Sequence, residues 1–145
     1  MPCVQDILAN KGSEVQTVSP DTSVLNAARL MNKHHIGCLV VIDGDRVVGM
    51  FSERDILRRI VVPCRDPGET TVDQVMTTEV ICCRPHTKVL EARGVMKNRR
   101  IRHMPVVDDD EQLIGLISIG DLNAHDMHEH ESTIYIMEQY IYGRT

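Results

Sequence analysis

The segment Gly49-Met50-Phe51-Ser52-Glu53-Arg54-Asp55 decides the fold, because its pattern returns as Gly115-Leu116-Ile117-Ser118-Ile119-Gly120-Asp121. Each copy places a glycine and two apolar residues before a serine, and an aspartate three residues after it. An apolar run that ends in Ser-x-x-Asp indicates a strand followed by a helix, because these side chains can accept hydrogen bonds from the free N–H groups of the first helical turn. The chain therefore contains two equivalent strand-to-helix junctions.

The repeat extends beyond these junctions. Setting Val15 against Val80 and advancing in step aligns prolines, threonines and apolar positions, with one extra residue in the second copy. The matched pairs are Pro20 with Pro85, Thr22 with Thr87, Val24-Leu25 with Val89-Leu90, Ala27 with Ala92, Met31 with Met96, Ile36 with Ile101, Val41 with Val106 and Asp43 with Asp108. The preceding segments 4–8 and 72–76 also match in pattern, so the chain is a tandem duplication.

Each copy predicts the order strand, helix, strand, strand, helix. In the first copy we expect extended chain at 15–18, a helix capped by Thr22, strands at 39–42 and 47–51 around a turn, and a helix at about 53–60. The second copy predicts extended chain at Cys82-Cys83, a helix at about 88–97, and strands at 104–107 and 113–117. A further helix is predicted at 132–142.

These elements predict an α+β fold. We expect the first repeat and its preamble at 1–62, a Pro- and Gly-containing linker at 63–71, the second repeat at 72–124, and a C-terminal segment at 125–145. Units this small bury too little surface alone, so the two repeats should pack on each other.

Length and composition exclude several classes of protein. The 145 residues are too few for a complete (β/α)8 barrel, which needs roughly 250. A hydrophobic content of 42% with 26% charged residues is typical of a globular protein, and the apolar runs fall short of the roughly 20 residues that span a bilayer. The N-terminal residues lack the pattern of a secretory signal, so we expect a cytoplasmic protein.

Charge and cysteine content narrow the partners and the compartment. The formal net charge of -5 argues against nucleic acid as the main partner, although a local basic site remains compatible with it. The five cysteines form no C-x-x-C pair, and their odd number favours reduced thiols.

The motifs carry a family resemblance. The doubled junction, together with the segment Ile101-Arg102-His103-Met104-Pro105-Val106-Val107-Asp108, resembles the CBS-domain family over residues 4 to 123. The resemblance implies a tandem CBS pair, also called a Bateman module, that binds adenosine nucleotides in clefts between its repeats. It also implies a regulatory homodimer without catalytic activity, which signals to a protein partner that the sequence does not identify.

The junctions suit nucleotide chemistry on physical grounds. Ser52 and Ser118 open helices, where unpaired N–H groups favour a phosphate. Asp55 and Asp121 follow one turn later, and a carboxylate can accept both hydroxyls of a ribose. A capping box, in which these side chains satisfy only the helix itself, explains the same pattern and remains open as the alternative.

The resemblance transfers a set of residues to a first cleft. Apolar members would hold the adenine, while Arg102 and His103 would face phosphate; a solvated loop cation is the alternative for Arg102. The expected ligand-binding residues are Met50, Ser52, Arg54, Asp55, Val80, Ile81, Ile101, Arg102, His103 and Pro105.

The corresponding second cleft is less well equipped. Gly37-Cys38 stands where Arg102-His103 stands in the first, so nearby phosphate donors are missing unless Lys33, His34 or His35 reaches the site. Its expected residues are Val15, Gln16, Thr17, Ile36, Gly37, Cys38, Leu116, Ser118, Gly120 and Asp121. We therefore expect unequal sites, with the first binding phosphate better.

Among ligands the sequence favours AMP, with NAD second, because ATP requires more cations than are visible. No catalytic residues, catalytic cofactor or metal site are expected; the histidines at 125, 128 and 130 could bind a metal, but a solvated polar segment is the more common explanation. Cys82 and Cys83 could be redox-sensitive or could pack, because neighbouring strand residues point to opposite faces. A structural dimerisation module with empty clefts and a thiol- or metal-dependent enzyme remain the alternatives.

Overall fold

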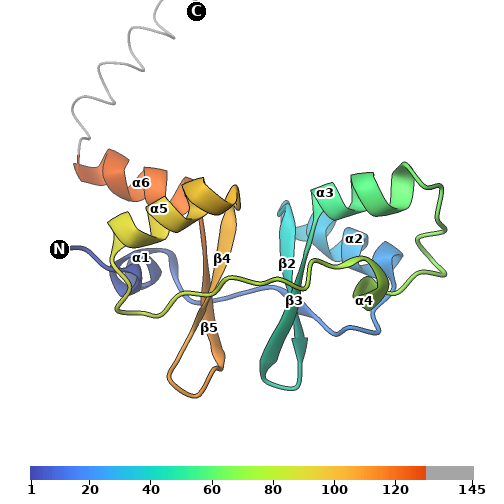
Figure 1. The fold of residues 1–145 in the computed structure, drawn as a ribbon, viewed down its shortest axis with the longest axis horizontal. Coiled ribbons are helices and arrows are strands. Elements are labelled where there is room, and N and C mark those ends of the chain that lie inside the picture. Colours follow the sequence, from blue (N-terminus) through green and yellow to red (C-terminus); the bar gives the residue numbers. More distant parts are fainter. Residues whose placement is uncertain (130–145) are drawn as a thin grey trace, which may run out of the picture.

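The structure is a computed structural model that describes residues 1–129, with side chains described to residue 126. It consists of two halves, each with a small sheet covered by helices, and the hairpins of the two halves meet at the centre of the molecule (Figure 1). This arrangement confirms the predicted α+β fold with two packed repeats. The helix predicted at 132–142 and the histidine at position 130 lie outside the described residues. No helix in the described part of the chain is long and apolar enough to cross a bilayer.

The two halves contain corresponding elements in the same order. The first half comprises β1 (Thr17–Val18), α2 (Val24–His34), β2 (Cys38–Asp43), β3 (Arg46–Ser52) and α3 (Glu53–Ile56), which continues as the π-helix η1 (Leu57–Val61). The second half comprises α5 (Val89–Arg99), β4 (His103–Val107), β5 (Leu113–Ser118) and α6 (Ile119–Glu129). Two preamble helices, α1 (Val4–Lys11) and α4 (Val72–Val75), precede the repeats.

The sheets differ at one edge. In the first sheet, β1 pairs in parallel with β2, and β2 pairs antiparallel with β3. The second sheet contains the antiparallel pair β4 and β5, and the extended chain predicted at Cys82-Cys83 contributes a single parallel bridge between Cys83 and Val106. In both hairpins the strand that enters from a helix begins opposite the junction serine, with Cys38 opposite Ser52 and His103 opposite Ser118.

The first-half helix α2 begins one residue later than predicted. Its N-cap is Ser23, whose Oγ accepts a hydrogen bond from the Asn26 N–H at 3.1 Å, so the assignment of the cap to Thr22 was wrong. The Thr22 hydroxyl lies 3.0 Å from the Ser19 hydroxyl, and the Thr22 carbonyl accepts from the Val72 N–H at 2.8 Å. The Thr22 backbone therefore pairs with the first residue of α4, the preamble helix of the second repeat.

The two preambles are exchanged between the halves. The N–H of Val4 donates to Thr87 at 2.8 Å, and the N–H of Val72 donates to Thr22 at the same distance. Buried side chains follow this pattern, because α1 completes the second-half core and α4 completes the first-half core. Burying one such aliphatic side chain stabilises the fold by roughly 1.5–3 kcal/mol, so each half depends on a helix from outside its own repeat.

The junction glycines make room for these exchanged helices. A Cβ at Gly115 would lie 2.7 Å from Leu8 Cδ2 of α1, and a Cβ at Gly49 would meet the Met76 side chain and lie 3.1 Å from the Thr77 carbonyl oxygen. Because glycine has no Cβ, both positions allow the preambles to pack closely against β3 and β5.

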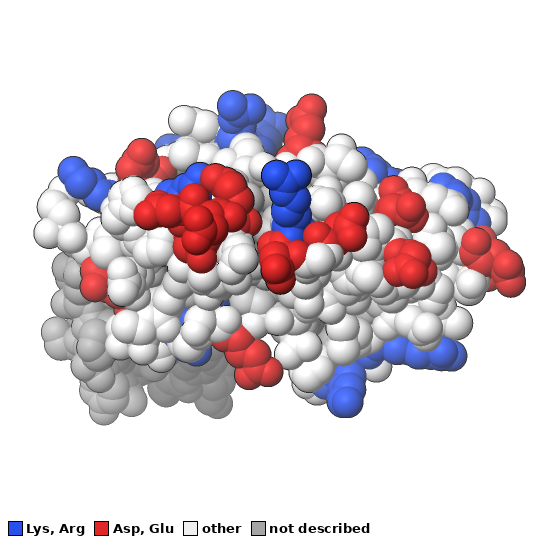
Figure 2. All heavy atoms as spheres, turned by 90° about the horizontal axis from the view of Figure 1, so that it is seen from below, with Lys and Arg blue, Asp and Glu red and all other residues white. Residues whose placement is uncertain are grey.

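Charge is divided between the two ends of the hairpins. The face seen in Figure 2 shows acidic side chains gathered near the hairpin turns, to which the sequence contributes Asp43, Asp45, Asp108, Asp109, Asp110 and Glu111. The opposite end of the first hairpin leads into α3 and η1, which carry Arg54, Arg58 and Arg59. An acidic chain thus contains a local basic region at its first junction.

Candidate ligand-binding cleft

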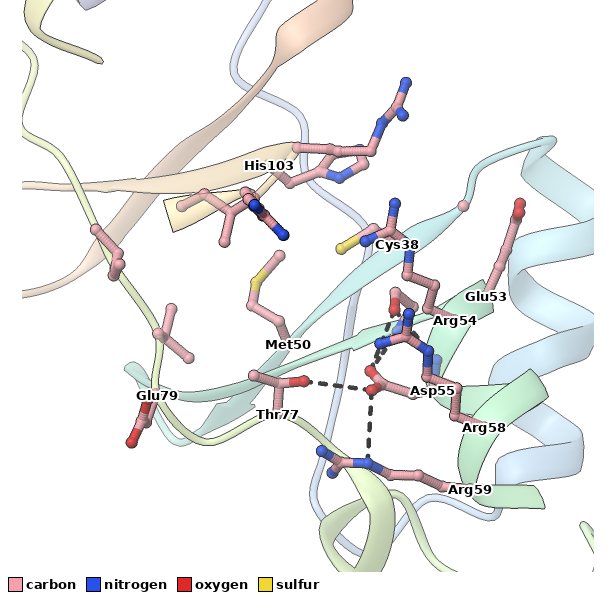
Figure 3. A pocket seen from close by; sticks show the side chains of 17 residues that line it. Cys38, Met50, Glu53, Arg54, Asp55, Arg58, Arg59, Thr77, Glu79 and His103 are labelled. Atoms are coloured by element: carbon pink, nitrogen blue, oxygen red, sulfur yellow. Dashed lines mark hydrogen bonds and ion pairs between the residues drawn. The ribbon is translucent and has the colours of Figure 1, made fainter. Parts of the chain in front are cut away.

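A cavity of about 590 Å³ opens between the two halves, next to the first junction. Its walls come from the start of β2, the end of β3, α3 and η1, the extended segment 77–81, and the loop that enters β4 (Figure 3). Small-molecule sites commonly enclose about 300–1,000 Å³, so the cavity has the size of a nucleotide site. The residues that line it are Gly37, Cys38, Met50, Ser52, Glu53, Arg54, Asp55, Arg58, Arg59, Thr77, Glu79, Val80, Ile81, Arg100, Ile101, Arg102 and His103.

The cavity brings together most of the residues expected in the first cleft. Nine of them line it, including the junction residues, the apolar pair at 80–81 and the segment 101–103. Pro105 does not line it, because it is buried within β4 opposite Leu116, and its carbonyl accepts from the Cys83 N–H at 2.9 Å. Gly37 and Cys38, which were expected in the second cleft, line this cavity because β2 runs beside β3.

At the first junction, Ser52 and Asp55 form a capping box. Asp55 Oδ2 accepts from the Ser52 N–H at 3.0 Å and from the Ser52 hydroxyl at 3.2 Å. The other oxygen, Oδ1, accepts from the Thr77 hydroxyl at 3.3 Å and lies 4.0 Å from Arg59 Nε. The carboxylate therefore caps α3 and also faces the preamble that borders the cavity, so capping and binding are compatible at this residue.

The cavity is richer in cations than the sequence indicated. Five arginines and three acidic residues line it, which leaves a net positive charge. Arg58 and Arg59 were missed, although they follow Arg54 and Asp55 at a spacing of four residues, which places such pairs on one helical face. The π-helical turn that carries them is a feature often found at functional sites.

The junction motif did not indicate that several other polar residues would line the cavity. Thr77 and Glu79 lie after α4 in the extended preamble, and the bridge between Thr77 and Met50 brings this segment to the cavity. Glu53 lies beside Gly37, whose carbonyl accepts from the Glu53 N–H at 3.0 Å. These positions depend on pairing between distant segments, which the repeat pattern alone does not indicate.

His103 lies where the two halves approach each other. It is half-buried, and this burial lowers the pKa of its imidazole, while the nearby Asp121 carboxylate acts in the opposite direction. The side chain is consequently neutral at neutral pH, with one ring nitrogen available as a hydrogen-bond donor. A bound anion would favour its protonated form.

The cysteines are protonated where they are buried. Burial raises the pKa of Cys38, in the cavity wall, to about 12, and that of Cys83 to about 12. Cys83 is buried and Cys82 is exposed, which confirms that the two neighbours point to opposite sides. A thiol is nucleophilic as the thiolate, so Cys38 and Cys83 are poorly suited to nucleophilic catalysis at neutral pH.

The second junction repeats the capping geometry but adds a lysine. Asp121 Oδ2 accepts from the Ser118 N–H at 2.8 Å, and the Asp121 N–H donates to the Ser118 hydroxyl at 3.1 Å. Lys11 Nζ lies 2.7 Å from the same Oδ2 and 2.8 Å from the Leu116 carbonyl oxygen. Lys11 had not been assigned to any site.

The other residues expected in the second cleft occupy varied surroundings. Thr17 lies in β1 opposite Val40, and the Gln16 carbonyl accepts from the Val40 N–H at 3.4 Å. Ile36 packs against the first-half core, Val15 is half-buried before β1, and Gly120 lies in the first turn of α6. Within residues 1–126, no three His, Cys, Asp or Glu side chains are placed to hold a metal ion.

The repeated halves, their exchanged preambles and the cavity between them define a tandem module of α+β type. A family model described as "CBS domain" matches residues 4–62 and again 72–127. The chain belongs to the CBS-domain family, and its tandem pair is a regulatory module.

Curated relatives support this assignment over most of the chain. The chain is 36% identical over 149 residues to the CBS domain-containing protein CBSX3, mitochondrial, of Arabidopsis thaliana, covering 97% of this chain and 72% of the relative. It is 35% identical over 127 residues to the CBS domain-containing protein YhcV of Bacillus subtilis, covering 88% and 87%.

Solved structures share the same fold. A putative signal-transduction protein with CBS domains from Burkholderia ambifaria is 38% identical, with a TM-score of 0.83 over 87% of this chain and 94% of that one. The CBS domain pair of protein MJ0100, solved in complex with 5'-methylthioadenosine and S-adenosyl-L-methionine, is 25% identical, with a TM-score of 0.78 over 89% and 98%.

Proposed function

We propose that this chain is a ligand-sensing regulatory module that binds an adenosine nucleotide in the cavity beside Ser52 and Asp55. AMP is the favoured ligand and NAD the second. The observation that carries the proposal is the cavity itself, in which the first junction faces apolar residues 80–81 and a group of arginines. An adenosine nucleotide combines the apolar base, the diol and the anion that such a wall can bind.

The roles of the residues follow from their positions. Met50, Val80 and Ile101 would contact the base, and Asp55 would accept from the ribose after releasing Thr77. Arg102 and His103 would face the phosphate, with Arg54 on the opposite wall. Arg58, Arg59 and Arg100 add positive charge, so ADP and ATP belong among the ligands to be compared with AMP.

The relatives support the class of ligand. The CBS pair of MJ0100 was solved with two adenosine compounds, 5'-methylthioadenosine and S-adenosyl-L-methionine, neither of which carries a phosphate. The arginines of the present cavity favour an anionic ligand over that neutral or cationic class. The proposed discrimination therefore rests on phosphate recognition by Arg102 and its neighbours.

Signalling completes the proposal. Nucleotide in the cleft would change the relation of the two halves, and a homodimer or a protein partner would detect this change. We propose no catalytic activity, since the buried Cys38 thiol has a raised pKa and the junction carboxylate is engaged in capping. Five free cysteines fit a reducing compartment, and we propose the cytoplasm.

One observation favours a second candidate, a structural dimerisation module. Both Asp55 oxygens already have partners within the chain, so the junction is satisfied without a ligand. The same experiment separates the two candidates, because only a ligand that binds the folded state raises the melting temperature.

Melting temperatures should be measured with AMP, ADP, ATP, NAD and S-adenosyl-L-methionine for the wild type, Asp55→Ala and the control Asp45→Ala. Asp45 is exposed in the β2–β3 turn, away from the cavity. We expect AMP to raise the melting temperature of the wild type and the control, and Asp55→Ala to lose this ligand-induced shift. Absence of a shift with all five ligands refutes sensing and leaves the dimerisation module, whereas progressive consumption of a ligand indicates an enzyme.

A further inference from the structure

Lys11 occupies the position at the second junction that a nucleoside would need. Its ammonium group forms an ion pair with Asp121 Oδ2 at 2.7 Å and donates a hydrogen bond to the Leu116 carbonyl at 2.8 Å. Asp121 is the counterpart of Asp55, and Leu116 is the counterpart of Met50. One side chain thus engages both the carboxylate and the backbone next to the apolar wall.

The first junction has no corresponding cation from its preamble. Aligning α1 with α4 places Lys11 opposite Glu79 and Ala9 opposite Thr77. The α4 helix ends at Val75, after which Thr77 pairs with Met50 in an extended conformation. The α1 helix continues to Lys11 and ends at Gly12, whose φ of 94° allows the chain to turn away. The longer helix delivers Lys11 to the second junction.

The ion pair is held by folded structure on both sides. Leu8 packs against the Gly115 position one helical turn before Lys11, which fixes α1 beside β5. The Ser118 N–H holds the same carboxylate oxygen from the other side at 2.8 Å. A ribose hydroxyl that approaches Asp121 must therefore displace an ammonium group that already has two acceptors.

We propose that Lys11 closes the second cleft to nucleotides, so that each chain binds one nucleotide, in the cavity beside Ser52 and Asp55. This inference rests on the proposed function and explains the inequality of the two clefts by an added side chain as well as by missing phosphate donors. Lys11 acts as an internal occupant, because its contacts with Asp121 and the Leu116 carbonyl replace those of a ribose.

The contacts of Lys11 should have a measurable effect on nucleotide affinity at the second cleft. The Lys11 and Asp121 side chains are 34% and 23% exposed, and partly exposed ion pairs and single hydrogen bonds are individually modest. Removing both contacts should strengthen nucleotide binding at the second cleft by roughly tenfold. This change is large enough to add a second binding event to a titration that covers the affinity of the first site.

Isothermal titration with AMP as the probe tests the inference on the wild type, Lys11→Ala, Lys11→Ala with Asp55→Ala, and the control Lys97→Ala. Lys97 is exposed on α5 and its substitution removes the same charge. We expect one AMP per chain for the wild type and the control, and two for Lys11→Ala. The double variant should retain a single site, which assigns the added site to the second cleft.

Each contrary result has a distinct meaning. Two sites in the wild type, or one site in Lys11→Ala, overturns the closure while leaving the proposed function intact. A loss of binding in Lys11→Ala overturns it too, because Lys11 would then be a phosphate ligand. Absence of AMP binding in all four proteins refutes AMP sensing, and the closure falls with it.

Discussion

The first and second junctions share a motif and a capping geometry, but they differ in what their exchanged preamble brings to them. At the first, α4 is short, and an extended segment carries Thr77 and Glu79 along the cavity. At the second, α1 is longer and places Lys11 on Asp121. The difference teaches that, in a duplicated fold, the part contributed from the other half can give two matching motifs different surroundings.

The largest effect tests whether the halves are one cooperative unit. Phe51 and Ile117 are equivalent positions, and both are fully buried. We expect Phe51→Ala to lower the free energy of unfolding by about 3–5 kcal/mol and Ile117→Ala by about 2–5 kcal/mol. Because the cores share exchanged helices, urea denaturation should show a single transition for each variant, and two separate transitions would contradict the interlocked packing.

A second prediction concerns Arg102, which we propose faces the phosphate in the first cleft. Hydrogen bonds to charged groups contribute about 1.5–3 kcal/mol, so Arg102→Ala should weaken AMP binding by roughly 10- to 150-fold. Arg99→Ala is the matched control, because Arg99 is exposed at the end of α5 and does not line the cavity. Equal affinities for the two variants, measured by calorimetry, would return Arg102 to the role of a solvated loop cation.

The junction glycines provide a third test. Gly115→Ala should destabilise the fold by about 1–3 kcal/mol, because the new Cβ would lie 2.7 Å from Leu8 Cδ2. Replacing Leu8 by Ala in the same chain should remove part of this penalty, which a double-mutant cycle of denaturation measurements would detect. Strict additivity of the two substitutions would show that α1 does not pack against β5 at this point.

The smallest effect is a pH dependence. Burial lowers the pKa of His103 below the usual histidine value of about 6.5, so the unfolded chain binds the proton more readily and this residue reduces stability as the pH falls through that value. Phosphate favours the imidazolium, so AMP affinity should rise by roughly two- to fivefold between about pH 7.5 and 5.5. His103→Gln provides the control for titration of AMP itself, and an identical pH profile in this variant would exclude His103 from phosphate binding.

Much of the fold could be predicted because the repeat places the same local signals in the same order. The junction serines, the apolar strands and the turns act over a few residues, and the doubled motif identified their register. The cap of α2 was misplaced by one residue, because Thr22 and Ser23 are both competent caps and the choice depends on the contact of Thr22 with Val72. That contact joins residues fifty positions apart.

The candidate site was harder to predict from the sequence, because contacts between residues far apart in the chain bring it together. Arg58 and Arg59 had a readable helical spacing from Arg54 and Asp55, whereas Thr77 reaches the cavity only through the bridge with Met50. Lys11 is more than a hundred residues from Asp121, and only the exchange of α1 into the second half brings them together. Pro105 shared a motif with Arg102 and His103 but is buried within β4 and does not line the cavity.

The exchanged preambles also bear on how the two repeats depend on each other. In this arrangement the core of each repeat is completed by the preamble helix of the other repeat. A single repeat would need a second copy for this helix exchange, which would then take place between two molecules. The linker at 63–71 joins the two repeats, so the helix exchange takes place within one molecule. The effective concentration of one repeat near the other is then set by the linker and not by the protein concentration. In the joined chain the two junctions need not match, and the lysine at the end of one exchanged helix gives Asp121 a partner that Asp55 does not have.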